Sequence, residues 1–426
     1  SDLSTTDIGE QLSASHLLEG SVRRRGDSVR VSATLVETSR GVQVWSEKYD
    51  HTMENVFAIQ ETIAEDIASA LKVKLSGDEG AGTAPLPHDT YELYLRGRHL
   101  LSQRGAALPQ AVAIFDAVTK QAPTYSDGWA SLATALHVSP AYTGTPEREV
   151  SAKAISAAKH ALSLSPDNAS ALAVMGAQRR RQGDWRGAED AFTRALALEP
   201  SNISALSWYG EFLLSVGHFD EALQKLQRAK SIDPLAAYTS AGLGWALYFN
   251  GDNTGAAREL DAAWNRFGLR VPYVWEGLYS LALDDGDYAR ARALITALPM
   301  PDPIKALHQK FVTAVETPSD KNIQNVQEAF AGLDALMPVP YYWRYEAFAR
   351  LGLEEAALVA AEHAVAQGEM DNYQALFTPA ARRFWASDKF ADITEAIGLM
   401  NYWETTSWPP FCADAAGGKL CKAATH

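Results

Sequence analysis

The sequence predicts a mainly α-helical protein in which paired helices stack into an α–α superhelix, preceded by a small, incomplete α/β segment with an antiparallel β-meander. Two observations lead to this prediction. Between positions 169 and 268, small, apolar and proline residues recur every 34 residues, a period typical of helical repeats. Between positions 17 and 49, apolar and polar residues alternate instead, which is typical of half-buried strands.

Six columns of residues keep the 34-residue step. Glycine adopts positive φ without strain, so one glycine column is expected in the turn between two helices. Another glycine column and an alanine column are expected where the two helices meet, and the prolines end the second helix. The columns are Pro166, Pro200 and Pro234; Gly176, Gly210 and Gly244; Gly183, Gly217 and Gly251; Ala188, Ala222 and Ala256; Phe192, Leu226 and Leu260; and Ala195, Ala229 and Ala263.

This period and these columns resemble the tetratricopeptide repeat (TPR). The likeness is strong in the two units that end at Pro200 and Pro234, and the third unit has Gly268 at the position of the final proline. Looser helix pairs are predicted on both sides, at 91–124, 126–166, 271–298, 304–336 and 341–367, with a Pro/Gly/Thr loop at 140–146. Short helices at 373–377, 379–386 and 393–399 are predicted to cap the array, which needs its last open face covered.

The N-terminal part is predicted to form three strands, at 17–24, 28–36 and 42–49, after a short helix at 8–15. A hairpin turn is expected at Gly26 and Asp27. An amphipathic helix at 54–75 is expected to cover the sheet, because its apolar residues recur at helical spacing.

Several stretches here resemble the TolB-like N-terminal α/β domain, which often precedes TPR arrays in bacterial signalling proteins. They are Leu-Glu-Gly-Ser-Val-Arg at 18–23, Val-Trp-Ser-Glu-Lys-Tyr-Asp at 44–50 and Phe-Ala-Ile-Gln at 57–60. The family's first strand and helix are missing, so we expect a partial domain at 1–75. A Gly/Pro-rich linker follows at 76–90, then the helical array at 91–400 and a tail at 401–426.

Charge and cysteine content narrow the classes of function. The net charge of −14 argues against a general nucleic-acid-binding surface, and no apolar run is long enough to span a membrane. Cys412 and Cys421 flank a short glycine-containing loop, so they form either a disulfide or two free thiols. A disulfide indicates an oxidising compartment. Together with the architecture of the resembled proteins, it favours a periplasmic location and a membrane anchor upstream of residue 1, with a cytoplasmic location as the alternative.

We find no pattern of catalytic, cofactor-binding or metal-binding residues in the sequence. The zinc-protease His-Glu-x-x-His, the phosphate-binding Gly-x-x-x-x-Gly-Lys-Ser/Thr and the Gly-x-Ser-x-Gly elbow are all absent. The two cysteines lack the matched histidine pair of a tetrahedral zinc site. The sequence therefore predicts a protein without enzymatic activity and without a cofactor.

The resemblance to TPR proteins implies that the first helix of each pair lines a concave surface. Counting from the repeat boundaries, inward positions also include Ala177, Ser207 and Leu214. Aromatic side chains with few charges suit an extended or helical peptide, but the same aromatics could instead pack between helices. The predicted binding residues are Arg180, Glu211, Tyr238, Trp245, Tyr248, Phe249 and Tyr273.

Three functional hypotheses follow. The first is a protein- or peptide-binding scaffold or sensor region of a bacterial signalling or regulatory protein. The second is an accessory structural subunit of a larger, membrane-associated complex. The third is an enzyme with an unfamiliar site, which would require a deep polar pocket with perturbed titrating groups. The sequence names neither the partner nor the oligomeric state.

Overall fold

The computed structural model describes residues 5–12, 14–25, 28–39, 41–52, 62–63, 66–67, 86–297, 299–337, 339–367, 373–412 and 420–421. The chain forms two compact units. One consists of Ser1–Gly97 with Ala117–Tyr125, and the other of Arg98–Asp116 with Ser126–His426. Within the described residues, no helix combines the length and the apolar character that crossing a bilayer requires.

The N-terminal unit contains a three-stranded antiparallel sheet of order β1-β2-β3, as the alternating pattern predicts. The strands are β1 (His16–Arg25), β2 (Ser28–Glu37) and β3 (Val42–Thr52). A short helix, α1 (Thr5–Leu12), precedes them and begins three residues earlier than expected. The predicted hairpin turn at 26–27 and residues 76–85 of the predicted linker lie outside the described residues.

One face of the sheet is buried around Ala33 and Tyr49. Ile63 packs against these residues, and the Tyr49 hydroxyl donates a hydrogen bond to Asp66 Oδ2 at 2.7 Å. Residues 62–63 and 66–67 are helical. These short pieces of the helix predicted at 54–75 therefore contact the sheet where the amphipathic pattern places them; the rest of that helix is outside the described residues.

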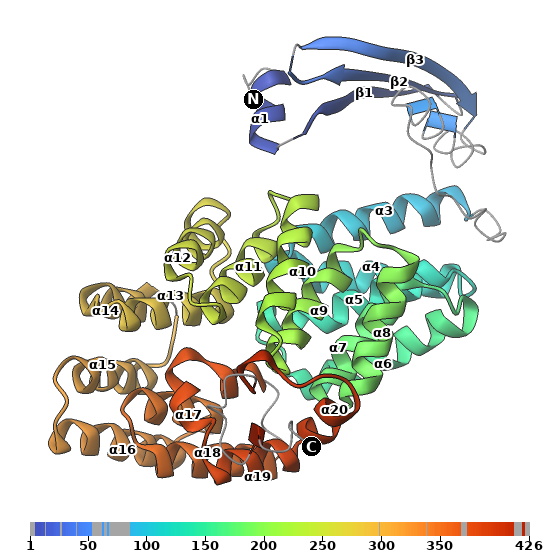
Figure 1. The fold of residues 1–426 in the computed structure, drawn as a ribbon. Helices are drawn as coiled ribbons and strands as arrows, with labels where there is room; N and C mark the ends of the chain where they lie inside the picture. The colour runs from blue at the N-terminus through green and yellow to red at the C-terminus, as the bar shows by residue number, and fades with distance from the viewer. Residues whose placement is uncertain are drawn as a thin grey trace. The chain divides into compact units, whose positions relative to one another are not determined.

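The remaining chain is a succession of helix pairs (Figure 1). In most pairs a short turn joins a first to a second helix, and the pairs follow one another directly along the chain. The pairs are α3 (His88–Gln103) and α4 (Leu108–Gln121); α5 (Ser126–Thr143) and α6 (Glu147–Leu164); α7 (Ala169–Arg181) and α8 (Trp185–Leu198); α9 (Ile203–Ser215) and α10 (Phe219–Ile232); α11 (Ala237–Phe249) and α12 (Asn253–Asp261); α13 (Pro272–Asp284) and α14 (Tyr288–Ala297); α15 (Asp302–Glu316) and α16 (Asp320–Asp334); and α17 (Tyr341–Arg350) and α18 (Glu354–Ala366).

The turns and helix starts of the repeats follow from single residues. Gly183, Gly217 and Gly251 have φ of 72°, 82° and 83°, the left-handed conformation that ends a helix. The side chains of Asn168 and Asn202 accept hydrogen bonds from backbone N–H groups in the first turns of α7 and α9, which caps these helices.

The second glycine column lets the two helices of a pair approach closely. A Cβ on Gly210 would lie 2.6 Å from Leu226 Cγ, and one on Gly244 would lie 2.6 Å from Leu260 Cγ. The same Leu226 also meets Gly242 of the following helix α11, where a Cβ would come within 2.8 Å. One leucine therefore fills the space within its repeat and the space to the next repeat.

Two stretches differ from the predicted boundaries. Pro140 lies inside α5, so the predicted 140–146 loop shortens to the residues after Thr143. Val138 and Ser139 are buried, and packing of this last turn outweighs the cost of an internal proline. At the C-terminus, 3₁₀ turns at Tyr373–Phe377 and Pro379–Phe384 precede α19 (Asp388–Ala396) and α20 (Leu399–Thr405). The last of these helices extends into the predicted tail.

The C-terminal segment, Tyr373–Cys412, folds back onto the middle repeats (Figure 1). It forms hydrogen bonds with the turn regions of three successive repeats. Trp185 Nε1 donates to the Ile397 carbonyl at 2.7 Å, Trp403 Nε1 donates to the Val216 carbonyl at 2.9 Å, and Arg382 donates to the Phe249 carbonyl at 2.7 Å. The segment therefore does more than cap the last repeat.

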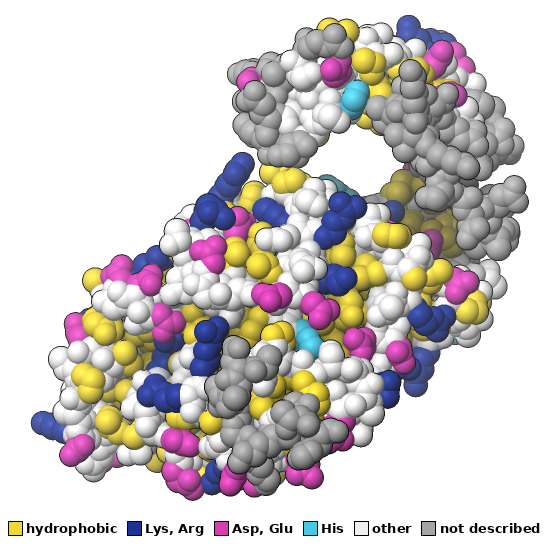
Figure 2. Space-filling model, in the orientation of Figure 1, with side chains coloured by type: hydrophobic (Ala, Val, Ile, Leu, Met, Phe, Trp, Pro, Cys, Tyr) yellow, Lys and Arg dark blue, Asp and Glu magenta, His cyan; other side chains and the backbone are white. Residues whose placement is uncertain are grey.

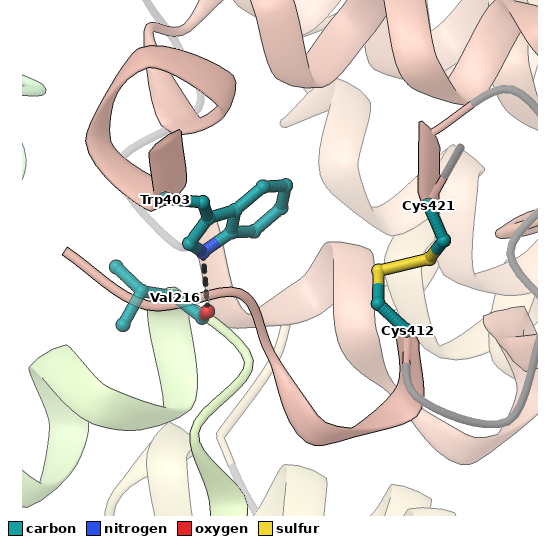
Figure 3. Close-up of a disulfide and its surroundings, with 4 residues drawn as sticks. All are labelled: Val216, Trp403, Cys412 and Cys421. Atoms are coloured by element: carbon teal, nitrogen blue, oxygen red, sulfur yellow. Dashed lines mark hydrogen bonds between the residues drawn. A yellow bond between two sulfur atoms is a disulfide. The ribbon is translucent and has the colours of Figure 1, made fainter. Parts of the chain in front are cut away.

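Cys412 and Cys421 are joined by a disulfide at the end of this segment, near the Trp403–Val216 hydrogen bond (Figure 3). Both cysteines are buried. The centroid of the neighbouring Phe411 ring lies 4.3 Å from that of Trp385, with the two rings tilted, and the Phe411 ring stacks on Phe219 of α10 at 6.5 Å. The disulfide thus lies beside the aromatic cluster that packs the segment against the repeats.

We predict that Gly210→Leu destabilises the helical unit by at least about 2 kcal/mol, because its side chain has no room beside Leu226. Thermal unfolding of the purified chain measures this effect. The matched control is Gly332→Ala in α16, whose Cβ would meet nothing within 4 Å and should be neutral or slightly stabilising. Equal melting temperatures for Gly210→Leu and wild type would contradict the helix contact.

Candidate functional site

A cavity of about 450 Å³ lies between the first helices of successive repeats. Most of its wall comes from α5, α7, α9, α11 and α13, the first helices of five successive pairs. The other lining residues are Arg104, Glu147 of α6, Leu269 and Val271 before α13, Tyr342 of α17 and Gln374 of the C-terminal segment. We call this the central cavity.

Four of the seven predicted binding residues line the central cavity: Arg180, Glu211, Tyr238 and Tyr273. They come from four successive first helices, α7, α9, α11 and α13, so the repeat register places them side by side as counted. Ser207, another predicted inward position, also lines the cavity.

The other three predicted residues, Trp245, Tyr248 and Phe249, lie in the packed interior. Their exposed fractions are 5%, 1% and 0%. Trp245 Nε1 donates to the Tyr273 carbonyl at 3.0 Å, and the Tyr248 hydroxyl donates to Asp284 Oδ2 at 2.6 Å. These three aromatic residues therefore pack between helices, which was the alternative to lining the concave surface. Helices α13 and α17 and the C-terminal segment cover the last turn of α11.

Arg180 is the most deeply placed cation of the cavity. Its side chain is buried, with Nη2 3.8 Å from Glu211 Oε2 and Nη1 donating to Ser215 Oγ at 3.3 Å. Burial raises the pKa of Glu211, and the neighbouring Arg180 and Arg181 only partly offset it. Arg181 forms its own ion pair with Glu147 of α6.

Burial also shifts the pKa values of two uncharged side chains near these arginines, His137 and Tyr273. The pKa of His137 is well below its ordinary value because of burial and then because of the nearby arginines, so its ring is neutral. The His137 ring shares a hydrogen bond with Gln178 at 3.0 Å. The pKa of the Tyr273 hydroxyl is raised by burial and by Glu211.

Sequence reasoning missed the cavity residues outside the clear repeats. Arg104 follows α3, Tyr142 ends α5, and Tyr342 and Gln374 lie more than 100 residues beyond α9 in the chain. Arg104 stacks its guanidinium over the Tyr238 ring at 5.0 Å. No column of the repeat carries these residues, so the sequence holds no periodic signal for them.

A second, smaller cavity of about 50 Å³ lies between α13, α15 and α17. Aromatic rings form its wall: Trp275 stacks on Tyr279 at 4.7 Å, and His308 lies edge-on to Trp275 at 5.1 Å. Burial raises the pKa of Glu346 in this wall to about 7, although Arg350 opposes the shift. Burial lowers the pKa of His308 to about 4.

Among the described residues, the side chains grouped closely enough to hold a metal ion are His88, Asp89 and Glu92. They lie at the exposed start of α3. His88 Nε2 is 3.0 Å from Glu92 Oε1, a pairing one helical turn apart that accounts for the grouping.

Residues 179–241 match the family model of the tetratricopeptide repeat. The helix pairs within this stretch are similar to tetratricopeptide repeats. The matched stretch begins at the end of α7 and reaches into α11. Proteins built of TPRs are generally scaffolds for protein–protein interaction and not catalysts.

The chain also resembles individual proteins. A putative adenylate cyclase 3 of Rhizobium meliloti is 31% identical over 102 residues, which is 23% of this chain and 17% of that protein. PilF of Pseudomonas aeruginosa is 19% identical, with 50% of this chain and 92% of PilF covered and a TM-score of 0.37. A monomeric mutant of IFIT1 with Gppp-AAAA is 15% identical, with 78% of each chain covered and a TM-score of 0.47.

We predict that Trp245→Ala lowers the free energy of unfolding by about 3–5 kcal/mol, because it removes a buried indole and its hydrogen bond to Tyr273. Chemical denaturation monitors the loss. Leu336→Ala serves as control, since Leu336 is 72% exposed and the change should stay within about 0.5 kcal/mol. A Trp245 variant as stable as this control would place the indole at the surface.

The raised pKa of Glu346 predicts that the fold loses stability as the pH rises. A carboxyl whose pKa rises from 4.5 to about 7 on folding stabilises the fold below pH 4.5, and this contribution is lost as the pH rises to 7. Glu346→Gln should therefore gain about 3 kcal/mol relative to wild type between these pH values. Urea denaturation of both proteins across the pH range tests this. A difference in unfolding free energy between Glu346→Gln and wild type that does not vary with pH would show that the pKa of Glu346 is not raised.

Proposed function

We propose that the helical unit is a protein-interaction module of a bacterial signalling or regulatory protein, and that a partner protein or peptide docks on the inner side of the TPR array at the central cavity. The TPR fold supports the scaffold role. The position of the cavity between successive first helices supports this side as the docking surface.

The observation that carries the proposal is the half-buried rim of the central cavity. Tyr142, Tyr238 and Tyr273 are each partly exposed there, beside Arg104 and Glu211. Partly exposed aromatic and arginine side chains are the residue types that contribute most to protein interfaces. On the face drawn in Figure 2, basic and acidic side chains are mixed over the helical unit. That face therefore does not attract a partner through charges of a single sign.

The signalling context and the compartment belong to the same proposal. The partial likeness to a protein named as a putative adenylate cyclase supports a signalling role, although the chain spans only 17% of that protein's length. The bond between Cys412 and Cys421 supports an oxidising compartment, and we propose the periplasm.

We predict that Tyr238→Ala removes partner binding with little loss of stability, because this ring is half-buried at the rim. Pull-down from the native source, with retained proteins identified by mass spectrometry, measures the effect. Tyr288→Ala in α14 is the matched control, since Tyr288 is also half-buried but does not line the cavity. Proteins retained by wild type and by Tyr288→Ala should be lost with Tyr238→Ala; equal retention by both variants would move the docking surface elsewhere.

A further inference from the structure

Buried polar atoms without a hydrogen-bond partner gather at the central cavity. Among the described residues, most side-chain atoms of this kind belong to its wall. Such an atom costs free energy that an apolar residue of similar shape would not. The wall atoms are Arg104 Nε and Nη1, Arg180 Nε, Ser207 Oγ, the Tyr273 hydroxyl and Gln374 Oε1.

Three of these side chains are more than nine-tenths buried. Arg180, Ser207 and Gln374 have exposed fractions of 8%, 5% and 6%. They come from α7, α9 and the C-terminal segment, so only the folded-back chain brings them to one cavity. These groups are more buried than the rim residues Tyr142, Tyr238 and Tyr273.

Arg104 adds a guanidinium that forms no ion pair within the described residues, although the carboxylates of Glu147, Glu211 and Glu276 also line the cavity. By contrast, Arg180 faces Glu211 and Arg181 faces Glu147. Its backbone has φ 58° and ψ −158°, a conformation that strains a residue with a side chain. The chain therefore holds this guanidinium at the cavity in spite of a local energetic cost.

The unpartnered atoms define the chemistry of a complementary ligand. The arginine N–H groups only donate, the Ser207 and Tyr273 hydroxyls both donate and accept, and Gln374 Oε1 only accepts. A ligand that satisfies them carries an anionic group with several acceptor oxygens and at least one O–H or N–H donor. The volume of about 450 Å³ falls within the range of small-molecule pockets, about 300–1,000 Å³.

We propose that the central cavity binds a small organic acid that also carries a hydroxyl or amino group. The N–H groups of Arg104 and Arg180 bind its carboxylate, and Gln374 Oε1 accepts a hydrogen bond from its donor. This ligand is separate from the docked partner of the proposed function, and its binding is measured on the purified chain without any partner.

Thermal shift and titration calorimetry with D-gluconate, L-malate and L-glutamate as individual probes test the proposal. At least one of these acids should raise the melting temperature by a few degrees at saturating concentration. Succinate, which has no donor group, and glycerol, which has no charge, should bind about tenfold or more weakly. Failure of all three acids to shift the melting temperature, or an equal shift with glycerol, would overturn the proposal.

Substitutions provide a test that does not depend on the probe. In the ligand-free chain, Ser207→Ala should leave the melting temperature unchanged or raise it, because it removes an unsatisfied buried polar group. Arg104→Met removes two unsatisfied N–H groups but also the contact with the Tyr238 ring, so its diagnostic readout is acid binding. Both should weaken acid binding about tenfold or more. The matched control is Ser126→Ala: Ser126 is equally buried, but its hydroxyl donates to the Ala161 carbonyl at 3.0 Å, so this variant should melt at a lower temperature.

If Ser207→Ala lowers the melting temperature as Ser126→Ala does, the Ser207 hydroxyl has a structural role and the proposal is wrong. The proposed function is judged separately. Loss of partner retention in Tyr238→Ala with persistent acid binding would support both conclusions, whereas acid binding without any retained partner would leave the ligand site standing and refute the docking surface.

Discussion

The close contact between the two helices of each regular repeat determines the rest of the helical unit. Leu226 fits against Gly210 within its own repeat and against Gly242 of the next, so a single side chain sets both the separation of paired helices and the step between pairs. Because this contact repeats, the first helices stay on one side, and the wall of the central cavity follows from it. A larger residue at Gly210 would change the pair and its neighbour together.

Most of the fold is predictable from the sequence because its signals are local and periodic. The turn glycines and the glycine–leucine columns each predict one local contact. The register derived from them places Arg180, Glu211, Tyr238 and Tyr273 at the cavity. The same register misassigns Trp245, because it counts positions on an isolated array and ignores chain that returns from far along the sequence. The sequence did not predict Arg104 and Gln374 for the same reason. They reach the cavity through packing between distant parts of the chain, and they follow no repeat period.

The central cavity combines two kinds of surface. Its rim presents partly exposed aromatic and charged side chains, whereas its deep wall contains polar atoms that the protein itself does not satisfy. A site used only for docking would gain nothing from burying Ser207 and Gln374. The arrangement fits a wall that takes part both in binding a small molecule and in binding a protein. A substitution at Arg180 or Glu211 would then affect both kinds of binding.

The C-terminal segment gives this array a folding behaviour that a simple solenoid lacks. Stacked repeats contact only their neighbours, so they can fray one by one from an end. Here hydrogen bonds join residues 212, 187 and 133 positions apart in the chain. Folding of the middle repeats is therefore coupled to folding of the C-terminal segment. Contacts between residues so far apart in the chain slow folding, and the structure of these repeats is complete only when residues from much later in the chain have packed against them.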